Sequence, residues 1–388
     1  MKPGSMGGAS SRPHSALERR TDAIAQGITN VLRSQAPAIA EQVVARQYNL
    51  RPEQWVAFGD EGRLKSVRDV RYHLDYLAEA VDAEDVGLFR AYVAWAQALF
   101  AGLGFDDAAL ARTLRLMAEA LGETLTHEQM SLLRPALDAG LEQAARKPSV
   151  PPSHLPEGAP LSSLARAYLD ALLDGDRRAA SRLILEAGEA GTLVQDLYLR
   201  VFQPVQREVG RLWQLNRVSV AQEHYVTAAT QLIMSQLYPR IFSTRRVGRC
   251  LVATCVGGEL HEIGVRMVAD LFEMAGWDSY YLGANTPPQG VLQALEERQA
   301  DLLAISATLT VHVGQVRALI ERVRATARRD PVILVGGYPF LLSSGLWQRV
   351  GADGFAPDAQ EAVRVANRLV DARLGASVDP GAGAGARG

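Results

Sequence analysis

The chain has 388 residues, of which 48% are hydrophobic and 22% are charged, and its formal net charge is −2. This length allows two or three domains with hydrophobic cores of their own. No apolar run approaches the length that spans a bilayer, and the first residues lack the core of a secretory signal, so we expect neither a membrane protein nor a secreted one. The two cysteines, Cys250 and Cys255, are interpreted as buried thiols in a reducing cytoplasm.

Residues 1–16 are rich in Gly, Ser and Pro, and we expect them to be disordered. Residues 17–146 show helical periodicity, and an all-α unit of this size favours a globin-like fold. Between Asp60 and Met130 there are 13 acidic and 7 basic side chains, so we expect no nucleic-acid partner. The helices are predicted at 17–33, 36–47, 51–57, 62–81, 85–103, 106–124 and 126–145.

Two of these predicted helices carry aromatic side chains and a histidine. Tyr72 and His73 lie on one helix, and Tyr92 and Trp95 lie three residues apart on the next, hence on one face. A pocket between the helices would hold a planar chromophore with His73 as its polar contact, whereas plain core packing is the alternative. Because the region has no cysteine, a tetrapyrrole here must be non-covalent. It would be a bilin such as biliverdin, or a haem with His73 as proximal ligand.

A Pro-rich linker at 147–160 separates this region from a predicted four-helix bundle at 161–245. Ser219 and Gln222 form a capping-box pattern before the last helix, and Thr192 and Gln195 form another before the third. The four helices are predicted at 161–173, 177–190, 192–215 and 219–242.

Residues 246–375 alternate between short apolar runs and stretches of helical length. Apolar runs without alternation indicate a parallel sheet that is covered on both faces, so we expect a five-stranded Rossmann-like unit. The whole chain is therefore predicted to be a multidomain α plus α/β protein, with a flexible tail at 376–388. The strands are predicted at 249–255, 279–282, 302–306, 332–335 and 354–355, with helices that include 264–274, 311–327 and 358–374.

Special residues follow these strands, where ligands of open α/β sheets bind. Glu259-Leu260-His261-Glu262-Ile263-Gly264 is followed after 41 residues by Ser306-Ala307-Thr308, and after 27 more by Gly336-Gly337. The order and spacing resemble the cobalamin-binding domain. The resemblance implies that His261 is the lower axial ligand of cobalt and that Glu259 orients its other ring nitrogen. It implies further that the Ser306–Thr308 element meets the displaced lower base, and that Gly264, Gly336 and Gly337 leave room for the nucleotide tail.

A second pattern lies in the bundle, where Trp213 is followed after nine residues by Glu223-His224. It resembles the signature of cobalamin-dependent photoreceptors of the CarH type, in which the tryptophan packs over the 5′-deoxyadenosyl group and the Glu and His contact it. The alternative is a core tryptophan and a solvated helix face. The residue after the tryptophan is Gln214, where the family has a histidine that binds cobalt after photolysis. His224 or solvent would have to take that position here.

The whole chain resembles the photocobilins, which combine a globin-like bilin-binding domain, a helical bundle and a cobalamin domain without a DNA-binding module. The resemblance implies a light sensor, not an enzyme, that uses adenosylcobalamin together with non-covalent biliverdin. We expect a homo-oligomer, dimer or tetramer, whose association depends on light, and an effector protein of unknown identity. The alternatives are a corrinoid methyl carrier of a methyltransferase system and a cobalamin-responsive module that ignores light. A DNA-binding regulator is disfavoured by the acidic helical region.

Overall fold

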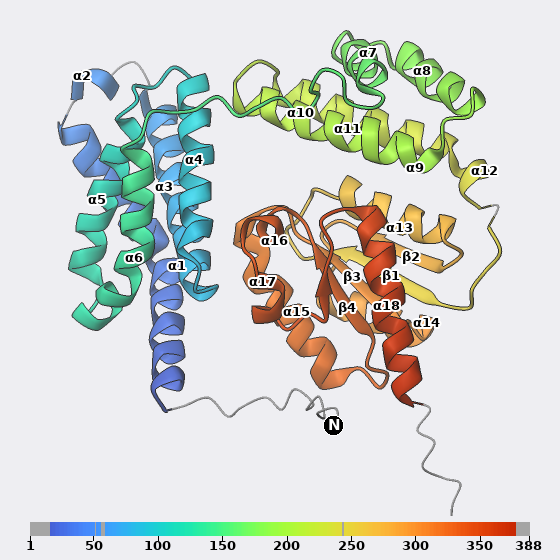
Figure 1. Ribbon diagram of the computed structural model, residues 1–388. Helices are drawn as coiled ribbons and strands as arrows, with labels where there is room; N and C mark the ends of the chain where they lie inside the picture. The colour runs from blue at the N-terminus through green and yellow to red at the C-terminus, as the bar shows by residue number, and fades with distance from the viewer. Residues whose placement is uncertain (1–15, 51, 56–58, 243, 378–388) are drawn as a thin grey trace, which may run out of the picture.

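The computed structural model describes residues 16–50, 52–55, 59–242 and 244–377 (Figure 1). Within these ranges the chain forms a helical N-terminal region, a second helical unit and a C-terminal α/β unit, as the predicted fold class requires. The predicted disordered start and flexible tail lie outside the described residues, except that residues 16, 376 and 377 belong to helices.

The N-terminal region is built from long helices that bury one face each. One prediction here is wrong: the helices expected at 17–33 and 36–47 are a single helix, α1, which passes through Pro37. Pro37 removes one backbone hydrogen bond, but Leu32 and Ile39 on either side of it are buried, so packing holds the helix together. The helices are α1 (Ala16–Leu50), α2 (Pro52–Trp55), α3 (Gly59–Asp82), α4 (Val86–Gly102), α5 (Ala109–Thr124) and α6 (His127–Ala144).

The second helical unit contains α7 (Ser162–Leu173) and α8 (Arg177–Glu189), followed by a long third helix and a fourth. The third consists of α9 (Val194–Leu197), a π-helical turn (Tyr198–Phe202) and α10 (Gln203–Gln214), and the fourth of α11 (Val220–Gln236) and α12 (Tyr238–Ile241). The capping box at Ser219 is confirmed. The one predicted at Thr192 is wrong. The Thr192 N–H donates to the Ala187 carbonyl at the end of α8, and the residue that precedes α9 is Leu193, which provides no side-chain cap.

The C-terminal unit is a parallel five-stranded sheet in the order β2-β1-β3-β4-β5. Cys255, Ser306 and Gly336 lie in register at the carboxyl ends of three adjacent strands. Both cysteines are free and buried, as predicted. The strands are β1 (Cys250–Cys255), β2 (Asp278–Gly283), β3 (Leu302–Ser306), β4 (Val332–Gly336) and β5 (Gly354–Phe355).

Helices cover both faces of this sheet (Figure 1). One face packs against α13 (Ile263–Met274) and α18 (Ala359–Ser377), and the other against α14 (Pro288–Arg298) and α15 (Val313–Thr326). A 3₁₀ turn (Thr310–His312) precedes α15, and the short helices α16 (Tyr338–Leu342) and α17 (Leu346–Arg349) follow β4. Among the described helices, none is long and apolar enough to cross a membrane.

The bundle and the N-terminal region each contact a different side of the sheet unit (Figure 1). On the α13 side, the Tyr198 hydroxyl of the bundle donates to Asp270 at 2.8 Å. On the α15 side, the Gly314 N–H donates to the Glu79 carboxylate at 2.9 Å, and Arg317 pairs with Asp82 at 3.1 Å. The carboxyl ends of the strands therefore have helical neighbours from both units.

Candidate functional site

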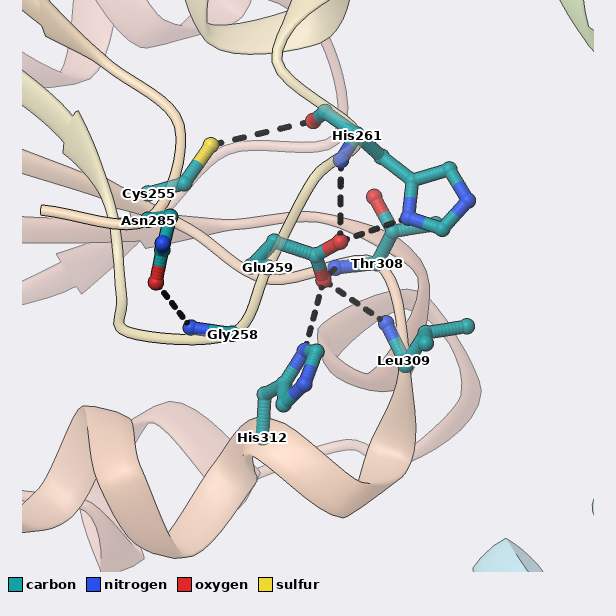
Figure 2. Close-up of polar contacts among 8 residues, drawn as sticks. All are labelled: Cys255, Gly258, Glu259, His261, Asn285, Thr308, Leu309 and His312. Carbon is teal, nitrogen blue, oxygen red and sulfur yellow. Dashed lines mark hydrogen bonds and ion pairs between the residues drawn. The ribbon is translucent and has the colours of Figure 1, made fainter.

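The centre of the candidate site is a buried carboxylate in the loop after β1 (Figure 2). Oε1 of Glu259 lies 2.5 Å from Nδ1 of His261 and also accepts that residue's backbone N–H at 3.0 Å. Oε2 accepts the backbone N–H groups of Thr308 at 2.7 Å and Leu309 at 3.1 Å. It also lies 2.9 Å from Nδ1 of His312. One carboxylate thus ties the loop after β1 to the loop after β3.

Electrostatics keep this carboxylate charged. Burial by itself raises the pKa of Glu259, but the hydrogen bonds from His261 and His312 outweigh burial and hold the pKa below its usual range. The hydrogen bond to Glu259 raises the pKa of His261 in turn, with a smaller contribution from the negative charge of Glu223 on the bundle. The contact with Glu259 therefore increases the basicity of the His261 imidazole.

The free edge of the His261 ring points away from the carboxylate (Figure 2). Nδ1 is occupied by Glu259, while the side chain as a whole remains 55% exposed. An imidazole held by a carboxylate on one nitrogen and open on the other is the arrangement of many metal-binding histidines. The donor set fits a cobalt ion that receives its remaining ligands from a corrin ring.

The glycines of the motif have different roles. Gly337 has φ +108°, and a Cβ there would lie 1.9 Å from the Ala307 carbonyl oxygen, so only glycine fits where the loops after β3 and β4 meet. A Cβ on Gly264 would meet nothing within 4 Å, so the first turn of α13 borders open space. A Cβ on Gly336 would touch the Ala356 carbonyl at 3.4 Å. The role of Gly264, Gly336 and Gly337 in holding a nucleotide tail therefore stays a prediction, with open space shown beside Gly264 alone.

The bundle residues singled out in the sequence lie at the end of α10 and in the first turn of α11. Trp213 and Glu223 are partly buried, whereas the side chain of His224 is 75% exposed. Nδ1 of His224 lies 2.5 Å from Glu223, which also accepts the Thr227 hydroxyl at 3.1 Å. Glu223 interacts electrostatically with His261. The structure therefore brings Glu223 toward the candidate cobalt ligand and leaves His224 on the surface beside it.

The predicted chromophore residues of the N-terminal region do not form one pocket. His73 and Tyr92 are buried, with His73 Nδ1 at 2.7 Å from the Tyr92 hydroxyl, and Tyr76 stacks on Tyr92 at 3.7 Å. Tyr72 and Trp95 are 51% and 39% exposed. Tyr72 lies next to His73 on α3, and successive helical residues point to different sides. Core packing thus accounts for His73 and Tyr92, while Tyr72 is exposed and Trp95 stacks with Tyr92 and with Trp213 of the bundle.

One atom of this core lacks a partner. Among the described residues, Nε2 of His73 is buried and has no hydrogen bond. Burial lowers the pKa of His73 to about 4, so the ring is neutral. The nearby ring of Phe100, 6.3 Å from that of His73, borders a cavity of about 10 Å³. His73 does not line this cavity, which is far too small for a tetrapyrrole.

Three residues of the site were not predicted from the sequence. His312 binds the second oxygen of Glu259, and Asn285 accepts the Gly258 N–H at 2.7 Å (Figure 2). Glu262 accepts the Tyr281 hydroxyl at 3.0 Å and the bundle's Gln231 at 2.7 Å. A signal existed for His312, which follows the Ser-x-Thr element by four residues at the start of a predicted helix. Glu262 and Asn285 lie in loops whose course the sequence does not specify.

Two sequence profiles match the chain, and both are described as a B12 binding domain. One matches residues 249–364, which form most of the sheet unit, and the other matches residues 164–238, which form most of the bundle. Neither match extends into the N-terminal region.

Curated relatives match over about half of the chain. A corrinoid protein of Desulfitobacterium hafniense is 28% identical over 218 residues, which cover 54% of this chain and 99% of the relative. The dimethylamine corrinoid protein of Methanosarcina barkeri is 30% identical over 168 residues, which cover 43% of this chain and 76% of the relative. The solved structure of the Methanosarcina barkeri monomethylamine corrinoid protein superimposes with a TM-score of 0.49 at 22% identity, covering 54% of this chain and 100% of that one.

Proposed function

Because the chain belongs to the cobalamin-binding corrinoid protein family, we propose that it holds cobalamin between the sheet unit and the bundle and senses the group on the upper face of cobalt. His261 is the proposed lower ligand, since Glu259 holds one ring nitrogen and leaves the other open. Gly264 borders the open space through which the nucleotide tail would pass. Ser306 and Gly336 lie in register at the carboxyl ends of β3 and β4.

The upper face would be formed by the bundle. Trp213 offers a flat aromatic surface, and Glu223 is the bundle carboxylate whose charge reaches His261. Bound adenosylcobalamin would supply a weak, photolabile cobalt–carbon bond. A tryptophan and a carboxylate beside that bond are suited to distinguish a large nucleoside group from a small ligand.

A sensor is supported by the contacts that the N-terminal region makes with both other units. Its Glu79 accepts a hydrogen bond from the sheet unit, and its Trp95 carbonyl accepts one from the side chain of Gln214 in the bundle at 2.9 Å. A change in how the bundle sits over the sheet would therefore move this region too. We propose that the bundle would sit differently over the sheet with and without an adenosyl group on the cofactor, and that the output is a change in association or in a partner protein, not a reaction catalysed by this chain.

Absorption spectroscopy of the protein loaded with adenosylcobalamin in the dark tests this proposal. We expect a base-off spectrum with histidine coordination that changes under green light in the wild type. His261→Ala should lose the histidine-bound spectrum, whereas exchange of the exposed His127 for Ala, as a matched control, should retain it. An adenosylcobalamin spectrum that resists green light at the intensity that bleaches free cofactor would contradict light sensing.

The comparisons favour a second candidate, a corrinoid methyl carrier, because the matched relatives are corrinoid proteins and one is the dimethylamine corrinoid protein. His261 would keep its role, the upper group would be methyl, and a methyltransferase would be the partner. A carrier must expose the upper face to that partner, whereas here the N-terminal region also holds the bundle. Tight methylcobalamin binding together with weak adenosylcobalamin binding would establish the carrier and refute the sensor.

A tetrapyrrole in the N-terminal region is a separate proposal, motivated by the unpartnered Nε2 of His73. Because His73 is only 2% exposed, a ligand at this nitrogen requires the helices around it to move apart. Titration with biliverdin and with haemin, followed by absorbance, tests it. A red-shifted bilin band that is lost in His73→Gln would support a bilin, a Soret band lost in the same variant would support haem, and no saturable binding of either would leave His73 as a core residue.

A further inference from the structure

Helix α4 connects the two units of the proposed cobalamin site. At its start, the Asp85 carboxylate accepts a hydrogen bond from Ser343 and one from Arg349 at 3.1 Å, both from the sheet unit. At its end, a Cβ on Gly102 would lie 2.8 Å from the backbone carbon of Leu215, just after α10 of the bundle. Its 17 residues span about 25 Å. The helix thus runs from the sheet unit to the bundle (Figure 1).

Trp95 lies on the part of α4 that faces the bundle. Its ring stacks with that of Trp213, with centroids 6.2 Å apart and planes 29° apart. Gln214, only 7% exposed, donates its side-chain amide to the Trp95 carbonyl at 2.9 Å and so fixes α4 against the end of α10. On its other side, Trp95 stacks with Tyr92 at 6.3 Å.

The Trp95 ring contacts aromatic rings on two sides and stays accessible to solvent on another. The side chain remains 39% exposed although it contacts Trp213 and packs beside Tyr92. A large aromatic residue that served only to join two domains would be expected to lose most of its exposure at the junction. The two indoles instead meet at the junction of α4 with the bundle, and part of Trp95 stays accessible there.

We infer that Trp95 is a specificity-determining residue of the upper-face site, which together with Trp213 forms a two-ring surface for the nucleoside group of adenosylcobalamin. The inference deepens the proposed function and rests on it. A purine with its ribose is large enough to cover both indoles, whereas a methyl group touches at most one. Because flat aromatic surfaces favour stacking, removal of Trp95 should weaken the larger ligand selectively.

Dark titrations of the full-length protein with adenosylcobalamin and with methylcobalamin test the inference, with absorbance and tryptophan fluorescence as readouts. Trp95→Ala should weaken adenosylcobalamin binding by about threefold to tenfold, the range expected for one aromatic stacking contact. The same variant should change methylcobalamin binding by less than about twofold, since a methyl group makes no such stack. Trp95→Phe, which keeps a ring if the Ala variant does not fold, should show a smaller loss of the same sign. Arg90→Ala, an exposed change on the same helix, is the control.

The outcomes separate this inference from the proposed function. Loss of adenosylcobalamin selectivity in Trp95→Ala supports both. An equal loss for the two cobalamins, or no change beyond that of Arg90→Ala, overturns the inference, while selectivity lost in Trp213→Ala would still support the sensor. Equal affinity of the wild type for the two cobalamins contradicts the proposed function before any Trp95 variant is considered, and the inference falls with it.

Discussion

The buried imidazole of His73 makes the stability of the N-terminal region depend on pH. Burial lowers its pKa from 6.5 to about 4, so the folded state resists protonation that the unfolded chain accepts. The unfolded state therefore binds more protons below pH 6.5, and stability is lost as pH falls from that value toward 4. From pH 7.5 to 5.5 the loss is about 1.3 kcal/mol.

Substitution of His73 by Gln removes this titration and keeps a polar side chain next to Tyr92. Hydrogen–deuterium exchange of the amides of α3 and α4, corrected for intrinsic exchange rates, measures the free energy of local opening. We expect the opening free energy of the wild type to fall by about 1.3 kcal/mol more than that of His73→Gln between pH 7.5 and 5.5. His127→Gln, at an exposed position, should retain the wild-type dependence.

Other groups titrate in the same region, and the comparison between variants removes them. Burial raises the pKa of Glu79 to about 7, so Glu79 contributes stability that is lost as pH rises, the sign opposite to that of His73. Its contribution is present in the wild type and in both variants. Identical pH dependence in the wild type and His73→Gln would refute the conclusion that His73 is held neutral in the core.

Two further predictions concern the loops of the candidate site. Gly337→Ala places a Cβ against the Ala307 carbonyl and should lower the free energy of unfolding, measured in urea on the cofactor-free protein, by about 3 kcal/mol. The control Gly264→Ala meets only open space and should leave that free energy almost unchanged. Equal losses in the two variants would show that the contact at Gly337 is unimportant. Glu259→Gln replaces the carboxylate whose hydrogen bond, and then whose charge, raises the pKa of His261, so the imidazole should titrate at lower pH in NMR of the cofactor-free protein. An unchanged pKa would contradict the assigned hydrogen bond.

The α/β unit was predicted closely because its signals are local. Four apolar runs and a fifth short strand specify the sheet, and the spacing of Glu259, Ser306 and Gly336 places them at strand ends. The single helix α1 was missed because Pro37 is a helix breaker by propensity, whereas burial of its flanking residues decides the outcome. The capping box predicted at Thr192 is wrong because a sequence pattern does not reveal that the backbone N–H of Thr192 is hydrogen-bonded to the end of the preceding helix.

The arrangement of the three units could not be predicted from the sequence. Nothing local to Gln214 indicates that its amide donates to the Trp95 carbonyl, or that Trp95 stacks with Trp213 of the bundle as well as with its neighbour Tyr92. Sequence spacing gives the face of a helix but not the partner of that face, so it does not separate the buried His73 and Tyr92 from the exposed Tyr72. His312 was missed for the same reason, since its contact with Glu259 joins two loops far apart in the chain.

The central claim is that His261 is the lower ligand of cobalt. Electron paramagnetic resonance of the Co(II) cobalamin complex tests it directly, with the protein's histidines labelled with ¹⁵N and the cofactor unlabelled. If His261 binds cobalt, the nitrogen superhyperfine splitting changes from a triplet to a doublet on labelling and is lost in His261→Ala. A triplet that persists in the labelled protein would show that the cofactor's own base remains on cobalt, and would contradict the account.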